Sequence, residues 1–152
     1  MTADDLKCEI SIALESIDNV LEKLADLYAD VGTRRPTVRE KVAAASFMAH
    51  FYNGIENVLK RITLYHGMPL PSGNMWQVDL FKQFCVPPHG SLPELFDDLI
   101  ASDLSPYRRF RHVFRHSYGF ELEWERMKEG IEKAPAIFVC VRRKIFHYLS
   151  GL

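Results

Sequence analysis

The chain has 152 residues, of which 47% are hydrophobic and 26% are charged, and its formal net charge is −1. This composition is that of an ordinary globular domain and excludes a disordered or low-complexity chain. Proteins that bind nucleic acid without sequence preference are usually strongly basic, so any RNA contact must come from a local cluster of cations.

No apolar run reaches the roughly 18 to 20 residues that a membrane-spanning helix needs, so we expect no membrane contact. The acidic N-terminus does not have the pattern of a secretory signal, which favours a cytoplasmic protein. Cys8, Cys85 and Cys140 are an odd number and form no CxxC pair, which argues against a disulfide framework or a thiolate zinc site. We expect them to be reduced and buried as small apolar residues.

The first two expected elements are long helices. Over residues 6–28 apolar side chains recur at spacings of three and four, as on a helix with one buried face, and Gly32 should end this helix. Thr37 followed by Glu40 has the spacing of a capping box and predicts a second helix that runs to about His66. The expected core stripe of that helix is Val42, Ala45, Ala49, Tyr52, Ile55, Leu59 and Ile62.

An irregular insert is expected at about residues 67–90. Two glycines and two prolines between Gly67 and Gly73 break the chain, and only residues 78–84 form a short apolar patch. Because the insert is longer than the usual connection, we expect it to pack on the bundle or to serve function.

Two helix starts are predicted after the insert. Ser91 with Glu94 has capping-box spacing and should open a short helix that ends near Ala101. Ser105-Pro106 places a capping hydroxyl before a proline at the first helical position, and this predicts a separate helix to about Tyr118.

The last expected helix spans about residues 120–148, with Pro135 as a kink inside it. Its stripe is Phe120, Trp124, Met127, Ile131, Ala134, Phe138, Val141, Ile145 and Tyr148. No strand pattern and no internal repeat are found. The sequence therefore predicts one all-α domain over residues 1–152, a bundle of four to five helices with long first and last helices.

Residues 105–118 carry the chemistry. They read Ser-Pro-Tyr-Arg-Arg-Phe-Arg-His-Val-Phe-Arg-His-Ser-Tyr, with four arginines, two histidines and no acid. Histidine exchanges protons near neutral pH, and a neighbouring arginine can hold the charge that develops on a phosphoryl group. The alternative is a solvated basic face paired with acids of neighbouring helices.

Helical spacing does not by itself select the residues that act together. Arg111 and His116 lie about 140° apart on an ideal helix, whereas Arg109, His112 and His116 share a face. Periodicity alone therefore favours His112 over Arg111 as the partner of His116. His112 and His116 could form half of a metal site, but no third ligand is apparent, so we expect no metal and no cofactor.

The run Arg111-His-Val-Phe-Arg-His-Ser-Tyr118 resembles the R-x4-H-x-Y signature of HEPN ribonucleases of the HepT type. The longer stretch 110–124 and the second-helix run 51–62 resemble one HepT-like branch. The resemblance implies a HEPN-type bundle and metal-independent RNA cleavage. It implies that His116 is the general base or acid and that Arg111 stabilises the phosphorane, with a 2′,3′-cyclic phosphate as product.

The same resemblance implies partners. Proteins of this family usually work as homodimers with the two motifs facing each other. In such a dimer the active groups could be completed between the two chains, so Arg111 and His116 of one chain need not share a helix face. They are typically encoded with an MNT-type nucleotidyltransferase antitoxin, which in several systems adenylylates the motif tyrosine, here Tyr118. As an alternative, Tyr118 is a partly buried aromatic residue that closes its helix.

Supporting roles are expected for Arg109, His112 and Arg115, as RNA-binding residues. Asn53 and Glu56 of the second helix either orient Arg111 or make an ordinary contact between helices. Two other functions remain open: a non-catalytic HEPN module that binds a nucleotidyltransferase partner, and a structural dimerisation module whose basic helix binds an acidic partner. Cleavage of RNA by the wild type but not by His116→Ala would separate catalysis from both.

Overall fold

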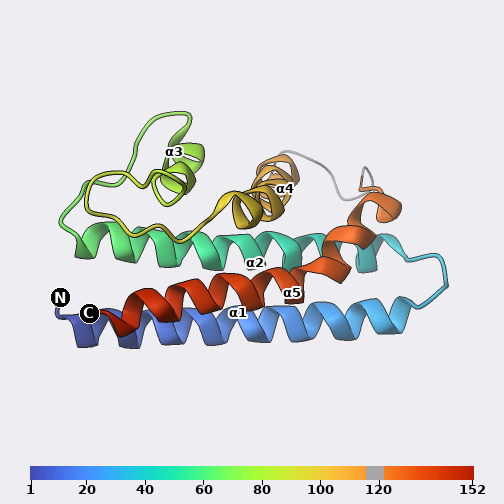
Figure 1. Cartoon of the computed structure of the whole chain (residues 1–152). Helices are drawn as coiled ribbons and strands as arrows, with labels where there is room; N and C mark the ends of the chain where they lie inside the picture. Colours follow the sequence, from blue (N-terminus) through green and yellow to red (C-terminus); the bar gives the residue numbers. More distant parts are fainter. Residues whose placement is uncertain (116–121) are drawn as a thin grey trace.

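The computed structural model describes residues 1–115 and 122–152, and these residues form five helices and no strand. The helices are α1 (Ala3–Val31), α2 (Val38–Tyr65), α3 (Trp76–Lys82), α4 (Asp98–Arg115) and α5 (Trp124–Ser150). The predicted all-α fold is confirmed. Figure 1 shows α1, α2 and α5 running side by side, with α3 and α4 on the other side of α2 and both termini at one end.

The hairpin of α1 and α2 follows its capping signals. Gly32 caps α1 at a φ of 54°, a conformation that glycine adopts without strain. The predicted capping box is present: the Thr37 hydroxyl accepts from the Glu40 amide at 3.1 Å, and the Thr37 amide donates to the Glu40 carboxylate at 2.9 Å. Tight packing joins the two helices, because a Cβ on Gly54 would lie 2.5 Å from the Ile17 side chain.

The insert is more ordered than the sequence predicts. Residues 76–82 form the short helix α3, which packs against α2. The apolar patch supplies the buried side chains of Leu80, Phe81 and Phe84, so burial of this patch holds the insert on the bundle.

The two helix starts predicted after the insert are wrong. Residues 91–97 are not helical, and α4 is a single helix of 18 residues that begins at Asp98. The cap is Asp97, whose carboxylate accepts from the Ile100 amide at 2.9 Å. Pro106 lies inside α4, where it removes the hydrogen bond to the carbonyl of Ser102. Ser102 is exposed, so water can bind that carbonyl in its place.

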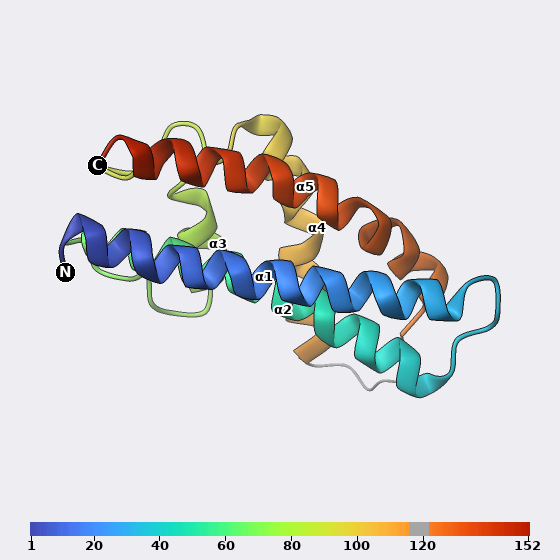
Figure 2. The same cartoon turned by 90° about the horizontal axis from the view of Figure 1, so that it is seen from below.

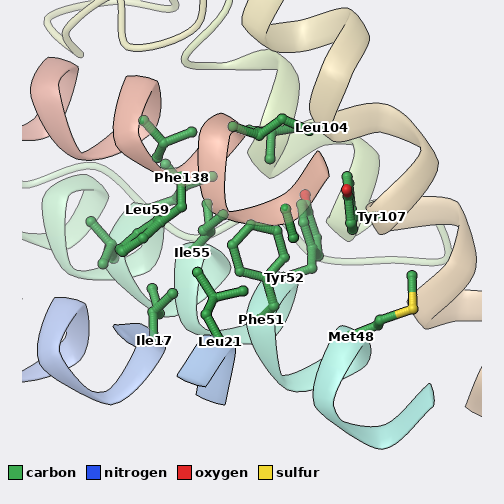
Figure 3. Packing of buried hydrophobic residues seen from close by; sticks show 14 of the residues in the cluster. Ile17, Leu21, Met48, Phe51, Tyr52, Ile55, Leu59, Leu104, Tyr107 and Phe138 are labelled. Carbon is green, nitrogen blue, oxygen red and sulfur yellow. The ribbon is translucent and has the colours of Figure 1, made fainter. Parts of the chain in front are cut away.

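The core is centred on Phe51 of α2. Its ring meets Tyr107 of α4 edge-on at 5.2 Å between centroids and Phe138 of α5 at 6.1 Å, so one side chain joins three helices (Figure 3). The Tyr107 hydroxyl donates to the carbonyl of Gly130 at 2.6 Å, which fixes α4 against α5. Figure 2 shows α4 crossing the direction of α1 and α5, and this crossing presents its basic end near α2.

The predicted buried faces hold with few exceptions. In the predicted core stripe of α2, Val42 is exposed and Ala49 is half-buried, whereas Ala44 and Met48, which the sequence did not place there, are buried. Phe120 of the last predicted stripe lies outside the described residues. Cys8 and Cys140 are exposed and Cys85 is half-buried, so the prediction of three buried thiols is wrong, and all three are free. Pro135 lies within α5, which changes direction along its length in Figures 1 and 2.

None of the helices in the described part of the chain is long and apolar enough to span a membrane.

Candidate functional site

Arg111 points from α4 into the interface with α2, where only 5% of it is exposed. Its Nη2 donates to Asn53 Oδ1 at 3.0 Å, and its Nη1 donates to Glu56 Oε2 at 3.2 Å and lies 3.1 Å from Oε1. Asn53 and Glu56 are three residues apart on α2, so they share a face and hold the guanidinium from one helix. The structure thus brings three of the expected site residues together.

Burial disfavours the charged form of both members of the pair. Glu56 is fully buried, and burial raises the pKa of its carboxyl, although the charge of Arg111 acts in the opposite sense. Burial likewise lowers the pKa of the Arg111 guanidinium, against the attraction of Glu56. Arginine nevertheless stays protonated in proteins. Desolvation therefore outweighs attraction, and the pair fixes geometry more than it adds stability.

Two further cations act on the same carboxylate. After Arg111, Lys60 and Arg115 also lower the pKa of Glu56, which places their charges near the pair. Arg115 is exposed one turn beyond Arg111, and the ammonium of Lys60 lies 4.6 Å from the centroid of the Trp76 ring. One buried carboxylate thus faces three cations, and the surplus of positive charge makes this end of α4 favourable for a phosphate.

Tyr52 completes the buried surroundings of the pair. Its hydroxyl is buried without a hydrogen-bond partner among the described residues. Burial, followed by the charge of Glu56, raises the pKa of this hydroxyl, so Tyr52 stays neutral beside the ion pair. Tyr52 therefore adds no charge to the surroundings of Arg111 and Glu56.

The other basic residues of α4 lie on a different side. Arg109 and His112 are exposed and line the space between α3 and α4. Arg108 is half-buried, with its guanidinium carbon 5.6 Å from the centroid of the Phe81 ring. Arg111 therefore does not share a face with Arg109 and His112, in agreement with the spacing of these residues in the sequence.

His116 and Tyr118 lie outside the described residues, so the arginine is the member of the R-x4-H-x-Y motif whose surroundings are known. Within residues 1–115 and 122–152, no group of three or more His, Cys, Asp or Glu side chains could hold a metal ion.

Sequence reasoning missed three residues of this site: Tyr52, Lys60 and Arg108. Tyr52 fits the apolar stripe of α2, so its polar end gives no signal. The other two could have been found from helical spacing, because Lys60 follows Glu56 by four residues and Arg108 precedes Arg111 by three.

The helical bundle is of HEPN type. Its helix α4 carries both the buried arginine that α2 holds and the exposed basic residues. The chain belongs to the HepT-like family, because the sequence profile described as "HepT-like protein" matches residues 43–152. That match takes in α2 from residue 43 onward and all of α3, α4 and α5, and it includes every residue of the site. No curated protein and no solved structure matches the chain. This family is typically related to HEPN nucleases, and membership suggests a toxin–antitoxin context.

Proposed function

We propose that this protein is a metal-independent RNA endonuclease and the toxin of a HEPN/MNT toxin–antitoxin pair. The observation that carries the proposal is the fixed position of Arg111, at the start of the R-x4-H run in a HepT-like chain. A guanidinium held by Glu56 and Asn53 is oriented before substrate arrives, which is the condition for electrostatic stabilisation of a transition state.

The proposed reaction is internal transesterification of RNA. A histidine removes the proton of the ribose 2′-hydroxyl, and the 2′-oxygen attacks the adjacent phosphorus. The bond from phosphorus to the 5′-oxygen breaks, and that oxygen takes up a proton. The products are a 2′,3′-cyclic phosphate and a free 5′-hydroxyl. His116 is assigned the role of base or acid, because its unperturbed pKa lies near neutrality.

Arg111 contributes to this reaction as a fixed charge. Both terminal nitrogens of its guanidinium already donate to α2 and only 5% of the residue is exposed, so Arg111 acts on the phosphorane through its field and through that small exposed part. The exposed Arg115, one turn further along α4, is free of this restraint and is assigned the direct phosphate contact. Two copies of the chain in a homodimer would bring two such motifs to one cleft.

Regulation is proposed to act on Tyr118. Adenylylation by the nucleotidyltransferase antitoxin would add a bulky anionic nucleotide two residues from His116. Its charge would occupy the cations that otherwise bind RNA, and its volume would exclude the substrate.

A second function is favoured by one observation. Arg111 is already engaged by Glu56 and Asn53, and such an ion pair between helices would also suit a module with no catalytic activity. Under this alternative the chain is a HEPN helical module that binds a nucleotidyltransferase partner.

The test is cleavage of RNA in excess chelator by the wild type and by His116→Ala. His147→Ala is the matched control, because it removes an exposed histidine from α5. We expect the wild type and the control to cut and leave cyclic-phosphate ends, and His116→Ala to be inactive. Equal cutting by all three would mean that the activity is a contaminant or that His116 is not catalytic.

Arg111 needs a different substitution, because Arg111→Ala would leave Glu56 buried without its partner. Arg111→Lys keeps the charge but loses the fork that reaches both Asn53 and Glu56. We expect a folded variant with reduced kcat. If the wild type, checked by mass spectrometry for an unmodified Tyr118, cuts no RNA, the binding module is the better assignment.

A further inference from the structure

A groove of about 330 Å³ separates the N-terminal end of α3 from the exposed side of α4. We call it the α3–α4 groove. Its α3 wall consists of Asn74, Met75, Gln77 and Val78. The two amide side chains both donate and accept hydrogen bonds, and the other two side chains are apolar. This wall therefore offers an apolar surface that a flat ring can contact, together with amide groups that can hydrogen-bond to the polar edge of that ring.

The α4 wall is basic. It consists of Arg108, Arg109, His112 and Val113, and no acidic residue lines the described groove. The cation–π contact with Phe81 holds Arg108 against α3, and its Nε is buried without a hydrogen-bond partner in the described part of the chain. Arg109 is exposed, so its guanidinium can reach a phosphate at the rim.

We propose that the α3–α4 groove binds one unpaired nucleotide of the RNA substrate, next to the bond that is cleaved. The proposal rests on the proposed function and names the substrate subsite of the same site. Arg108 precedes Arg111 by three residues on α4, so the groove and the buried pair are neighbours on one helix. A phosphate beside Arg111 and Arg115 would put the adjoining nucleotide within reach of the groove.

The lining favours a nucleotide over an acidic protein segment. A volume of about 330 Å³ lies at the small end of ligand pockets, enough for a single base and too small for a helix. Proteins recognise unpaired bases with a surface that contacts the ring and with hydrogen bonds to its edge, and cations hold the backbone. All three kinds of group are present here. The role of the insert, which the sequence leaves open, is thus to form the wall of the groove that contacts the base and determines base preference.

The binding test uses the full chain carrying His116→Ala, so that RNA is not cut, and a short fluorescent single-stranded RNA. Met75→Ala and Gln77→Ala are expected to weaken its binding roughly five- to tenfold. Leu64→Ala, which removes an apolar side chain of comparable exposure from α2, should leave binding unchanged. A duplex of the same sequence should bind all variants alike, because its bases are not available to the groove.

A second pair of variants tests the α4 wall. Val113→Glu puts a negative charge in the groove, and Leu99→Glu adds the same charge to an exposed position of the same helix. The two positions are separated by about 21 Å of helix, more than two Debye lengths at physiological salt. We expect Val113→Glu to weaken RNA binding at least tenfold, as an anion in a phosphate-binding groove should, and Leu99→Glu to bind as the parent does.

Cleavage by the same variants, made without His116→Ala, separates this inference from the proposed function. A raised KM with altered base preference at one position beside the cut supports the groove. Wild-type KM and base preference in every groove variant would overturn it and leave cleavage intact. Groove-dependent RNA binding without any cleavage would overturn the proposed activity alone. Absence of RNA binding would overturn both, and variants that lose only binding to the antitoxin would show that the groove is a protein interface.

Discussion

Two sides of α4 carry arginines that differ in burial. On the side that meets α2, Arg111 is buried and bound to Glu56 and Asn53. On the side that meets the α3–α4 groove, Arg109 and His112 are exposed. The first side places a charge where it cannot move, and the second presents the guanidinium of Arg109 at the surface.

Burial, not residue type, decides what an arginine of this helix does. A buried arginine is coupled to the stability of the bundle, because its removal leaves Glu56 without a partner. An exposed arginine contributes little to stability, and its effect on RNA binding depends on salt. The same substitution on the two sides should therefore give different measurements.

The largest difference is expected from Arg111→Ala. This change removes both hydrogen bonds to α2 and strands Glu56, so we expect a loss of about 3–5 kcal/mol of unfolding free energy. Urea denaturation followed by circular dichroism measures it. Arg109→Ala is the matched control on the exposed side, where a substitution usually changes stability by no more than about 0.5 kcal/mol.

A double variant sharpens this result. Arg111→Met combined with Glu56→Leu replaces the buried pair by apolar side chains and should regain most of the stability lost in Arg111→Ala. It should remain inactive on RNA, because the fixed charge is gone. Equal stability of Arg111→Ala and wild type would mean that the buried pair does not hold α4 on α2.

The second prediction concerns pH and Glu56. Because burial raises the pKa of this carboxyl above its ordinary 4.5, its contribution to stability is fully present below pH 4.5 and is lost as pH rises through the raised value. Glu56→Gln cannot ionise and escapes this loss. The variant should therefore gain stability relative to wild type as pH increases, by up to about 1.4 kcal/mol for each unit of pKa shift.

The measurement is the unfolding free energy of both proteins from pH 4 to pH 8. Glu9→Gln is the control, since Glu9 forms a half-exposed ion pair with Arg61, whereas Glu56 is fully buried. A variant that loses stability relative to wild type with rising pH would show that attraction to Arg111 outweighs desolvation at Glu56.

Much of the bundle could be predicted because its signals are local. The capping box at Thr37 and the end of α1 at Gly32 depend on side chains within a few residues, and the apolar stripes repeat at helical spacing. The start of α4 was mispredicted for the same reason. Ser91 and Ser105-Pro106 are valid local start signals, and packing of a longer helix against α2 and α5 overrides them.

The contacts within the site could not be predicted from local sequence. Asn53 and Glu56 could be suspected because polar residues interrupt the apolar pattern of α2, but nothing local says that they meet a residue more than fifty positions away. The α3–α4 groove could not be predicted at all. It depends on how the insert folds back on α4, which is a tertiary contact without a sequence period.

The smallest expected effect concerns the exposed side of α4 and is seen only in the salt dependence of RNA binding. Arg109→Ala removes one exposed cation, so the slope of log K for RNA binding against log salt should fall by about 1, with no change in unfolding free energy. Arg39→Ala removes an exposed arginine from the start of α2, away from the groove, and should keep the wild-type slope. Fluorescence anisotropy titrations at several salt concentrations measure both. An unchanged slope in Arg109→Ala would show that no phosphate binds Arg109 at the rim of the groove. Arg115, beside the buried pair, would then be the principal phosphate contact.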